Sequence, residues 1–344
     1  MSIVAHPYNA ELASAWDDFV SNQSRNGTIF HEQRFLEYHP PGRFTDASLV
    51  FHENGSAVEK IIGVFPAALV AQNGETRLVS HPGSSYGGLV YGPKTTARQV
   101  MEMVEGIIGH AQSLKAQSVE MRLAENLIFS DPPDQELGFM LWHRGFTRKS
   151  LELSSAINLL TGARLSGMKS TVRWSVGRAQ KDGVTVETER PVEEAYALIE
   201  KNLAAKYGKK PTHSLEELQE LKRRYPERIR IWSAMTDGQC AGTTVIFEAN
   251  RKSVHVFYIA QDYKFSKAQP LYLLFDRVVA HYADMGFECL NFGISSRERW
   301  IKWGILEFKE SFGARGVTRE TWALNDLAAP KPHDGPPHET GIRQ

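Results

Sequence analysis

The strongest constraint on the fold is an order of elements that occurs twice along the chain. In each half, a strand-like run and a polar loop lead into an amphipathic helix, and a second strand-like run follows. The helices are predicted over 97–114 and 270–285, with apolar residues at helical spacing. The second begins with Pro270 and is followed by Gly286, which are typical of a helix start and end. The pattern predicts an α/β protein with mixed sheets flanked by helices.

A second repeated feature is a turn dipeptide placed before a strand-like run. Asn54-Gly55 precedes IIGVFPAALV, and Asp237-Gly238 precedes CAGTTVIFEA, so both predict hairpins. These parallels indicate an internal duplication with units of roughly 150 residues. We place the first domain at 1–160 and the second at 161–327. The proline-rich, polar segment 328–344 has no apolar period and is predicted to be a disordered tail.

Composition limits the classes of partner. The 344 residues are 42% hydrophobic, enough for two domain cores. Forty basic side chains balance forty acidic ones, so a polyanion such as tRNA would need a local patch. No basic leader and no apolar run of about 20 residues occurs, so we expect a cytoplasmic protein without a membrane span. Cys240 and Cys289 are expected to be reduced, and the oligomeric state is not determined.

Motifs of the common enzyme classes are missing from the sequence. GxGxxG, GxxxxGK[ST], HExxH, CxxC and GxSxG do not occur in a supporting context, and no His and carboxylate cluster has metal-ligand spacing. The candidates for chemistry are four loops that carry glycine, aromatic and basic residues. They cover 81–88, 258–270, 291–303 and 307–315.

The loop EFKESFGARG contains Lys309 between Phe308 and Phe312. An ammonium group beside aromatic rings could stabilise the oxyanion of an acyl-transfer intermediate, worth about 3 kcal/mol when well placed. The alternative is a solvated lysine on a strand or turn whose phenylalanines fill the core.

Three further groups of polar residues have similar alternatives. Ser295, Arg297 and Arg299 follow a predicted strand, where arginines could clamp a carboxylate or phosphate or simply form a polar turn. His81 could be a general base or a hydrogen-bonded loop residue. Arg173 lies on a basic, helix-like stretch that could meet phosphates or form a solvated face.

The set of motifs resembles the FemAB/FemX peptidyltransferases and related FemAB-like acetyltransferase-fold proteins. The resemblance rests on RWSVGRAQKDGV, DGQCAGTTVIF, HVFYIAQDY, NFGISS and FKESFGARG, and it covers 169–322 well and the first half more loosely. It implies two acetyltransferase-like (GNAT) domains in tandem, with substrate in a cleft near their junction. It also implies direct transfer of an acyl group to an amine, without a covalent enzyme intermediate.

The resemblance also implies roles for particular residues. Lys309, with Phe308 before it, corresponds to the lysine of the FK motif, which stabilises charge at the reacting acyl ester. The matching loop of the first domain, which contacts the acceptor, would carry His81, Ser84, Ser85 and Tyr86.

The sequence departs from ordinary acetyl-CoA enzymes at one position. Their pyrophosphate loop is rich in glycine, because its backbone N–H groups bind phosphate at a helix N-terminus. Here that position reads YKFSKAQP, without glycine. No permanently bound cofactor is expected, and the acyl donor is either aminoacyl-tRNA or an acyl-CoA.

The leading hypothesis is an acyl- or aminoacyltransferase acting on an amine of a cell-wall or nucleotide-sugar precursor. Lys309 would polarise the donor carbonyl, and Arg297 or Arg299 would hold an anionic part of a substrate. The general base is His81, Tyr258 through a water, or the substrate itself. The alternatives are an acetyl-CoA-dependent N-acetyltransferase of an amino sugar and a non-catalytic binding protein with the same cleft.

Overall fold

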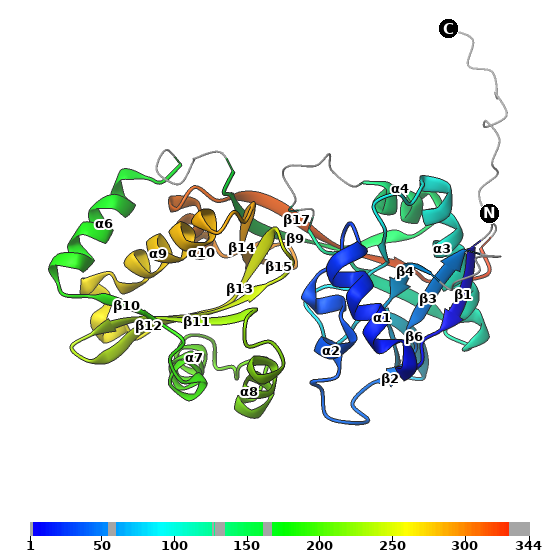
Figure 1. Ribbon diagram of the computed structural model, residues 1–344, viewed down its shortest axis with the longest axis horizontal. Coiled ribbons are helices and arrows are strands. Elements are labelled where there is room, and N and C mark those ends of the chain that lie inside the picture. The colour runs from blue at the N-terminus through cyan, green and yellow to red at the C-terminus, as the bar shows by residue number, and fades with distance from the viewer. Residues whose placement is uncertain (1–2, 54–59, 126, 128–134, 161–166, 330–344) are drawn as a thin grey trace, which may run out of the picture.

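The computed structural model describes residues 3–53, 60–125, 127, 135–160 and 167–329, and its two halves lie side by side (Figure 1). The strands of the first half are β1 (Ile3–Pro7), β2 (Thr45–Asp46), β3 (Leu49–Glu53), β4 (Ile61–Phe65), β5 (Ala68–Gln72), β6 (Glu75–Ser80), β7 (Val90–Tyr91), β8 (Ser118–Arg122) and β9 (Thr147–Asn158). Its helices are α1 (Ala13–Asp18), α2 (Gln33–Leu36), α3 (Ala97–Ser113) and α4 (Glu136–His143), with the short turns η1 (Ala10–Leu12), η2 (Phe19–Gln23) and η3 (Ile29–His31).

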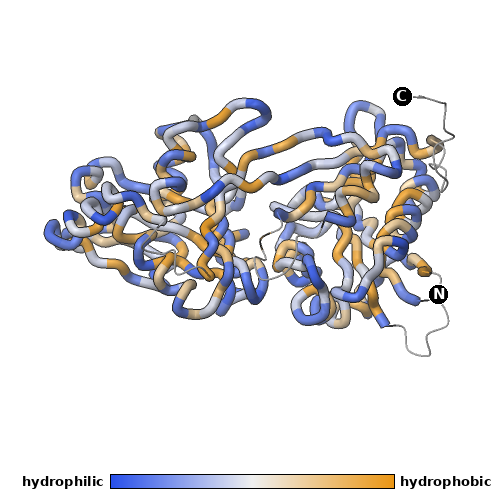
Figure 2. The backbone as a smooth tube through the Cα atoms, turned by 90° about the horizontal axis from the view of Figure 1, so that it is seen from above, coloured by the Kyte–Doolittle hydropathy of each residue, from blue (hydrophilic) through white to orange (hydrophobic). Residues whose placement is uncertain are grey.

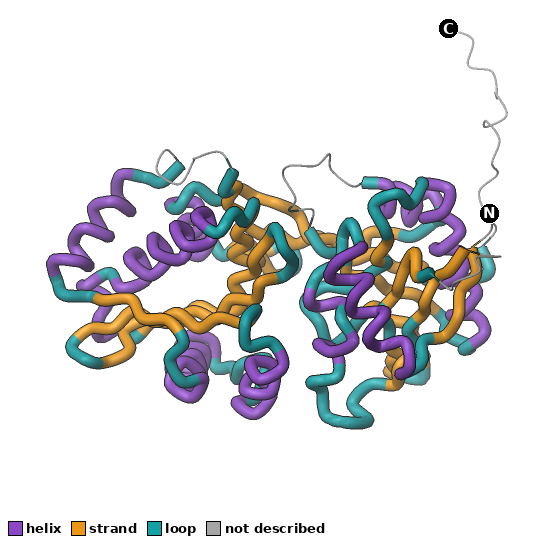
Figure 3. Tube along the Cα trace, in the orientation of Figure 1, coloured by secondary structure: helices purple, strands orange, loops and turns teal. Residues whose placement is uncertain are grey.

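The second half repeats part of this order: several strands are followed by a long helix, a strand, a shorter helix and a last long strand. Its strands are β10 (Thr185–Thr188), β11 (Ile229–Thr236), β12 (Gln239–Glu248), β13 (Ser253–Gln261), β14 (Cys289–Ile294), β15 (Ser296–Arg297), β16 (Trp300–Ile301) and β17 (Arg315–Leu324). Its helices are α6 (Ser170–Lys181), α7 (Val192–Tyr207), α8 (Leu215–Arg224), α9 (Pro270–Asp284) and α10 (Trp303–Ser311), with the turn η4 (Tyr263–Ala268). Helices flank the strands in both halves, which confirms the predicted class of tandem, mixed sheets flanked by helices (Figure 3).

The predicted duplication is visible in the strand pairing. In the second half, α9 connects β13 to its parallel partner β14, and in the first half α3 precedes β8, which pairs in parallel with β6. The hairpin at Asp237-Gly238 is confirmed, because both residues have the positive φ that a tight hairpin turn requires. Strands β3 and β4 pair antiparallel as expected, whereas the turn at Asn54-Gly55 lies outside the described residues.

The last strand of each half pairs with the other half. Strand β9 lies beside β14, strand β17 lies beside β8, and the two long strands pair with each other. They form the centre of an eleven-stranded sheet of order β10-β11-β12-β13-β14-β9-β17-β8-β6-β5-β2, beside a four-stranded sheet β1-β3-β4-β7. Seen from above, the two long strands β9 and β17 run from one half to the other (Figure 2). A domain boundary drawn by sequence position assigns β17 to the second half, although its end, with Trp322 and Leu324, is packed in the core of the first.

A shared hydrophobic core also joins the halves. Phe30 and Phe35 of the first half pack with Leu218, Phe247 and Tyr258 of the second. Burying one such side chain stabilises the fold by about 1.5–3 kcal/mol. The relative position of the two halves is therefore fixed by the core as well as by the exchanged strands.

Two further sequence-based expectations concern the state of the cysteines and the presence of a membrane-spanning helix. Both cysteines are free, Cys289 buried on β14 and Cys240 partly buried on β12. In the part of the chain that the structure describes, no helix is both long and apolar enough to cross a bilayer. Residues 330–344 of the predicted tail lie outside the described residues.

Candidate active site

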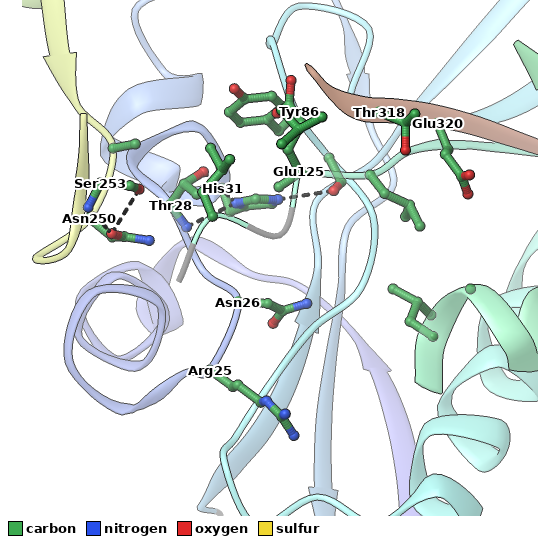
Figure 4. A pocket seen from close by; sticks show the side chains of 18 of the residues that line it. Arg25, Asn26, Thr28, His31, Tyr86, Glu125, Asn250, Ser253, Thr318 and Glu320 are labelled. Atoms are coloured by element: carbon green, nitrogen blue, oxygen red, sulfur yellow. Dashed lines mark hydrogen bonds between the residues drawn. The ribbon is translucent and has the colours of Figure 1, made fainter. Parts of the chain in front are cut away.

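A cavity of about 740 Å³ lies where the two halves meet. Its walls come from the segment 25–31, the loop after β6, the residues that follow β8, helix α4, the start of β13 and strand β17. Tyr86, Glu125 and His31 line it together with Thr318 and Glu320 (Figure 4). The cavity thus combines first-half loops with the exchanged strand of the second half.

Tyr86 connects the two halves at this cavity. Its hydroxyl accepts a hydrogen bond from Asn291 Nδ2 at 3.0 Å and lies 3.1 Å from Nδ1 of His255. His255 and Asn291 are the last paired residues of the parallel β13–β14 ladder, so Tyr86 lies where these strands separate. Burial, with the charges of Arg319 and Lys309, lowers the pKa of His255 to about 3. His255 is therefore neutral at pH 7 and accepts the hydrogen bond that the Tyr86 hydroxyl donates.

Lys309 supports this arrangement from behind the cavity wall. Its Nζ donates to the carbonyl oxygens of Gly293 at 2.7 Å and Ile294 at 2.9 Å, in an irregular part of β14. Asn291 Oδ1 in turn accepts from the Gly293 N–H at 2.8 Å. Lys309 is only 2% exposed and does not line the cavity. Burial, then the charges of Lys302 and Arg319, lowers its pKa to about 7.

Glu125 is the cavity residue with the most unusual surroundings. It lies three residues after the end of β8 and is 7% exposed, and neither carboxylate oxygen has a hydrogen-bond partner among the described residues. Burial, then the charge of Glu125, raises the pKa of Tyr86 well above its usual value. The charge of Arg319 attracts Glu125, although the Arg319 N–H groups donate twice to Glu152, at 3.1 and 2.6 Å. An unpaired buried acceptor costs about 1–3 kcal/mol, and more when charged, so this carboxylate suits a ligand that brings a cation or N–H groups.

His31 has a different role in the same cavity. Its Nδ1 accepts from the Thr28 N–H at 3.1 Å, and its Nε2 donates to the Gly87 carbonyl at 3.0 Å. Burial lowers its pKa, which agrees with a neutral ring. Because both ring nitrogens are occupied, His31 holds the cavity wall in shape and has no free nitrogen for proton transfer.

Two residues predicted as general bases lie in a separate group, which we call the histidine cluster (His39, His81 and His213, with Tyr38 and Tyr258). His81 Nδ1 accepts from the Gly83 N–H at 3.2 Å, and Tyr258 accepts from the His213 N–H at 3.1 Å. Burial lowers the pKa of His81 to about 3 and raises that of Tyr258 to about 12. Neither lines the cavity.

The other predicted site residues are dispersed. Ser84 donates to the Phe30 carbonyl at 3.0 Å, with Ser85 next to it in the loop, and Ser295 is buried against β9. Arg297 and Arg299 are exposed on the β15–β16 hairpin. Phe308 packs against Tyr272, and Arg173 lies on α6, where its Nη1 donates to the Met168 carbonyl. Of the predicted set, only Tyr86 lines the cavity, and Lys309 reaches it through Asn291.

Sequence analysis missed Glu125 and His255. Glu125 comes just after the buried strand SVEMR, and the edge where strands end is where ligand sites form in α/β sheets. His255 is an inward-facing polar residue in the otherwise apolar run VHVFY. Each is a single residue without a motif, so only its position relative to strand ends could have indicated it.

The loop before α9 is organised around a carboxylate. Asp262 accepts from the Lys264 N–H at 3.2 Å and forms an ion pair with Lys201 at 3.0 Å. The N–H groups of Phe265 and Gln269 are bonded within the loop, and Pro270 has none. An internal anion and internal bonds therefore use the groups that bind pyrophosphate in other proteins with this element order.

Comparison with known proteins finds a matching domain family and solved structures with a similar fold. Residues 166–309 match the Acetyltransferase (GNAT) domain family, so the second half carries a domain of acyltransferase type. The fold is that of FemX, with a TM-score of 0.71 at 11% identity over 94% of this chain and 98% of that one. A tandem GNAT protein from the clavulanic acid biosynthesis pathway (TM-score 0.54, 11%, 94% and 98%) and L-PGS from Bacillus licheniformis (0.56, 12%, 92% and 92%) are also similar. No curated protein matches the sequence.

These findings confirm the predicted resemblance at the level of the fold. The chain has the fold of FemX and of a tandem GNAT protein, and the acetyltransferase domain matched by residues 166–309 supports the predicted acyltransferase class.

Proposed function

We propose that the protein transfers an acyl or aminoacyl group from a carrier to an amine that binds in the cavity between its halves. The observation that carries the proposal is Glu125, a buried carboxylate at the cavity wall with no hydrogen-bond partner among the described residues. A protonated amine supplies the N–H donors that the Glu125 oxygens lack, and its charge is attracted to the carboxylate.

Glu125 is also suited to move the proton that the reaction releases. The amine must be neutral to attack, so the carboxylate first takes one proton from the bound ammonium group. The amine nitrogen then attacks the acyl carbonyl carbon, the C–N bond forms and the bond to the carrier oxygen or sulfur breaks. The remaining excess proton passes to the leaving group, and no covalent enzyme intermediate is needed.

The rest of the network positions this reaction. Tyr86 is held by His255 and Asn291, and Asn291 is held by the bulge that Lys309 supports. Fixed geometry of this kind lowers the barrier by avoiding reorganisation during the reaction. In this interpretation Lys309 is a positioning residue, whereas the sequence resemblance implies that it contacts the donor ester.

The donor we favour is an aminoacyl ester such as aminoacyl-tRNA. The support is the loop before α9, where Asp262 and internal hydrogen bonds occupy the groups that would bind the CoA pyrophosphate. For the acceptor we propose an amine of a cell-wall or nucleotide-sugar precursor, on the FemX-like motifs of the sequence. A cavity of about 740 Å³ is large enough for a ligand of that class.

The test is thermal stability and turnover against a panel of acyl-CoAs, charged tRNA and amine-bearing nucleotide sugars. A ligand that binds only the native state raises the melting temperature. We expect a shift with an amine-bearing precursor and amide formation with charged tRNA, detected by mass spectrometry. A shift and turnover with acetyl-CoA would instead favour the N-acetyltransferase alternative. Binding of a precursor without turnover of any donor would contradict the proposed activity.

A further inference from the structure

The β15–β16 hairpin and the first residue of α10 expose an unusual surface. Within the segment 297–303, Trp300 is 78% exposed and Trp303 is 62% exposed. Ile301 is exposed beside them, together with the basic residues Arg297, Arg299 and Lys302. We call this set the Trp300 surface. Large side chains that remain outside a core in such a cluster indicate an interaction site.

The hairpin is anchored firmly, so the exposure is a built feature of the fold. The Ser295 N–H donates to the Leu153 carbonyl at 2.6 Å, and the Leu153 N–H donates to Ser296 Oγ at 2.8 Å. The Lys302 N–H closes the base of the hairpin on the Ser295 carbonyl at 2.8 Å. Glu298 adopts the positive φ of a tight turn, which sets Trp300 opposite Arg297. The buried base therefore holds the tryptophans outward.

The composition of the surface favours a membrane over a nucleic acid. Three cations stand against the single carboxylate of Glu298, on a chain whose total charge is zero, so the attraction to an anionic surface is local. Tryptophan is favoured at the boundary between headgroups and acyl chains. Ile301 would gain from entering that boundary, but an aliphatic side chain offers no face on which a base could stack.

We propose that the Trp300 surface binds the protein to membranes that contain anionic lipid. Trp300, Trp303 and Ile301 enter the headgroup region, and Arg297 and Arg299 contact lipid phosphates. The attachment is peripheral and reversible, because it uses a few side chains of one hairpin. It does not rest on the proposed enzymatic function, and its test needs no substrate.

The experiment is co-sedimentation of the full chain with vesicles of phosphatidylcholine alone or mixed with phosphatidylglycerol, at low and high salt. We expect binding only to the mixed vesicles, and weaker binding at high salt. The double variant W300S/W303S should lose at least about tenfold in the partition coefficient, since it removes the largest inserting groups. The matched control is W142S, because Trp142 is also 63% exposed but lies on α4 of the other half.

Two further measurements decide between lipid and RNA. The variant R297Q/R299Q should bind mixed vesicles more weakly and with a smaller salt dependence than the original chain. The proposal is overturned if the original chain stays in the supernatant with mixed vesicles at low salt, or if W300S/W303S binds like W142S. Fluorescence anisotropy with labelled, uncharged tRNA completes the test. RNA binding that W300S/W303S abolishes, without vesicle binding, would assign the surface to RNA.

Discussion

Two clusters of buried polar residues lie between the halves: the histidine cluster and the residues around Tyr86 at the cavity. They differ in the kind of side-chain atom that lacks a hydrogen-bond partner. In the histidine cluster, the unpaired buried atom among the described residues is the ring nitrogen Nδ1 of His39, on a ring whose pKa burial lowers. At the cavity, the unpaired group is the carboxylate of Glu125. A neutral nitrogen without a partner costs about 1–3 kcal/mol, and a buried carboxylate without a hydrogen bond costs more. The comparison indicates that the histidine cluster has a structural role and that the cavity is suited to bind a ligand.

The largest effect is expected at Glu125. The variant Glu125→Gln keeps the shape but removes the charge and the proton acceptor, so kcat should fall by about a hundredfold or more. Its melting temperature should stay close to that of the original chain, because the amide keeps the volume of the carboxylate. The control is Glu120→Gln on β8, where the carboxylate pairs with Arg77 and Lys149. Full activity in Glu125→Gln would remove the basis of the proposed mechanism.

A variant of Lys309 tests whether this side chain positions other residues or takes part in catalysis directly. In Lys309→Met the side chain volume is nearly kept, but the carbonyls of Gly293 and Ile294 lose their donor. We expect the free energy of unfolding to drop by about 1–3 kcal/mol, and kcat to drop by roughly tenfold to a hundredfold. Urea denaturation and steady-state kinetics measure the two. The control Lys201→Met removes a surface ammonium that pairs with Asp262.

A different result for Lys309→Met would favour the role implied by sequence resemblance. If kcat falls by two or more orders of magnitude while stability and KM stay unchanged, the ammonium group contacts the donor in the transition state.

Two tyrosines offer a matched pair, one in each polar group. Tyr86→Phe removes the hydroxyl shared by His255 and Asn291, and should reduce kcat about tenfold. Tyr258→Phe removes the partner of His213 and should lower stability by about 1 kcal/mol while leaving kcat within twofold. Equal losses of activity in both variants would show that the histidine cluster also takes part in catalysis.

The smallest expected effect is the pH dependence of stability that arises from the histidine cluster. Burial lowers the pKa of His81 to about 3 and that of His213 to about 4, whereas unfolded histidines titrate near pH 6.5. Below pH 6.5 the unfolded chain binds protons that the folded chain does not, so stability falls as pH falls. Between pH 7.5 and 5.5 we expect a loss of about 1 kcal/mol per histidine. Denaturation of His81→Asn should show a correspondingly smaller loss, and an unchanged pH dependence would contradict the assignment.

Sequence analysis predicted the local elements well, because their signals are local. Apolar spacing and end residues gave the helices α3 and α9, and turn chemistry gave the hairpin at Asp237-Gly238. The exchange of β9 and β17 was not predicted, since pairing between strands far apart in sequence leaves no periodic trace in either strand. The same limit applies to the candidate site. Tyr86 and Lys309 were singled out in separate loops, but only the fold connects them through Asn291.

By itself, the sequence determined the class of this protein, its duplication and its two principal helices, since hydrophobic periodicity and turn residues act over a few positions. The tertiary structure alone decided which polar residues meet. It placed His81 and Tyr258 in the histidine cluster, and it left Glu125 at a cavity without a partner among the described residues. The physical reason is that burial and hydrogen-bond satisfaction depend on neighbours from distant parts of the chain, which only folding brings together.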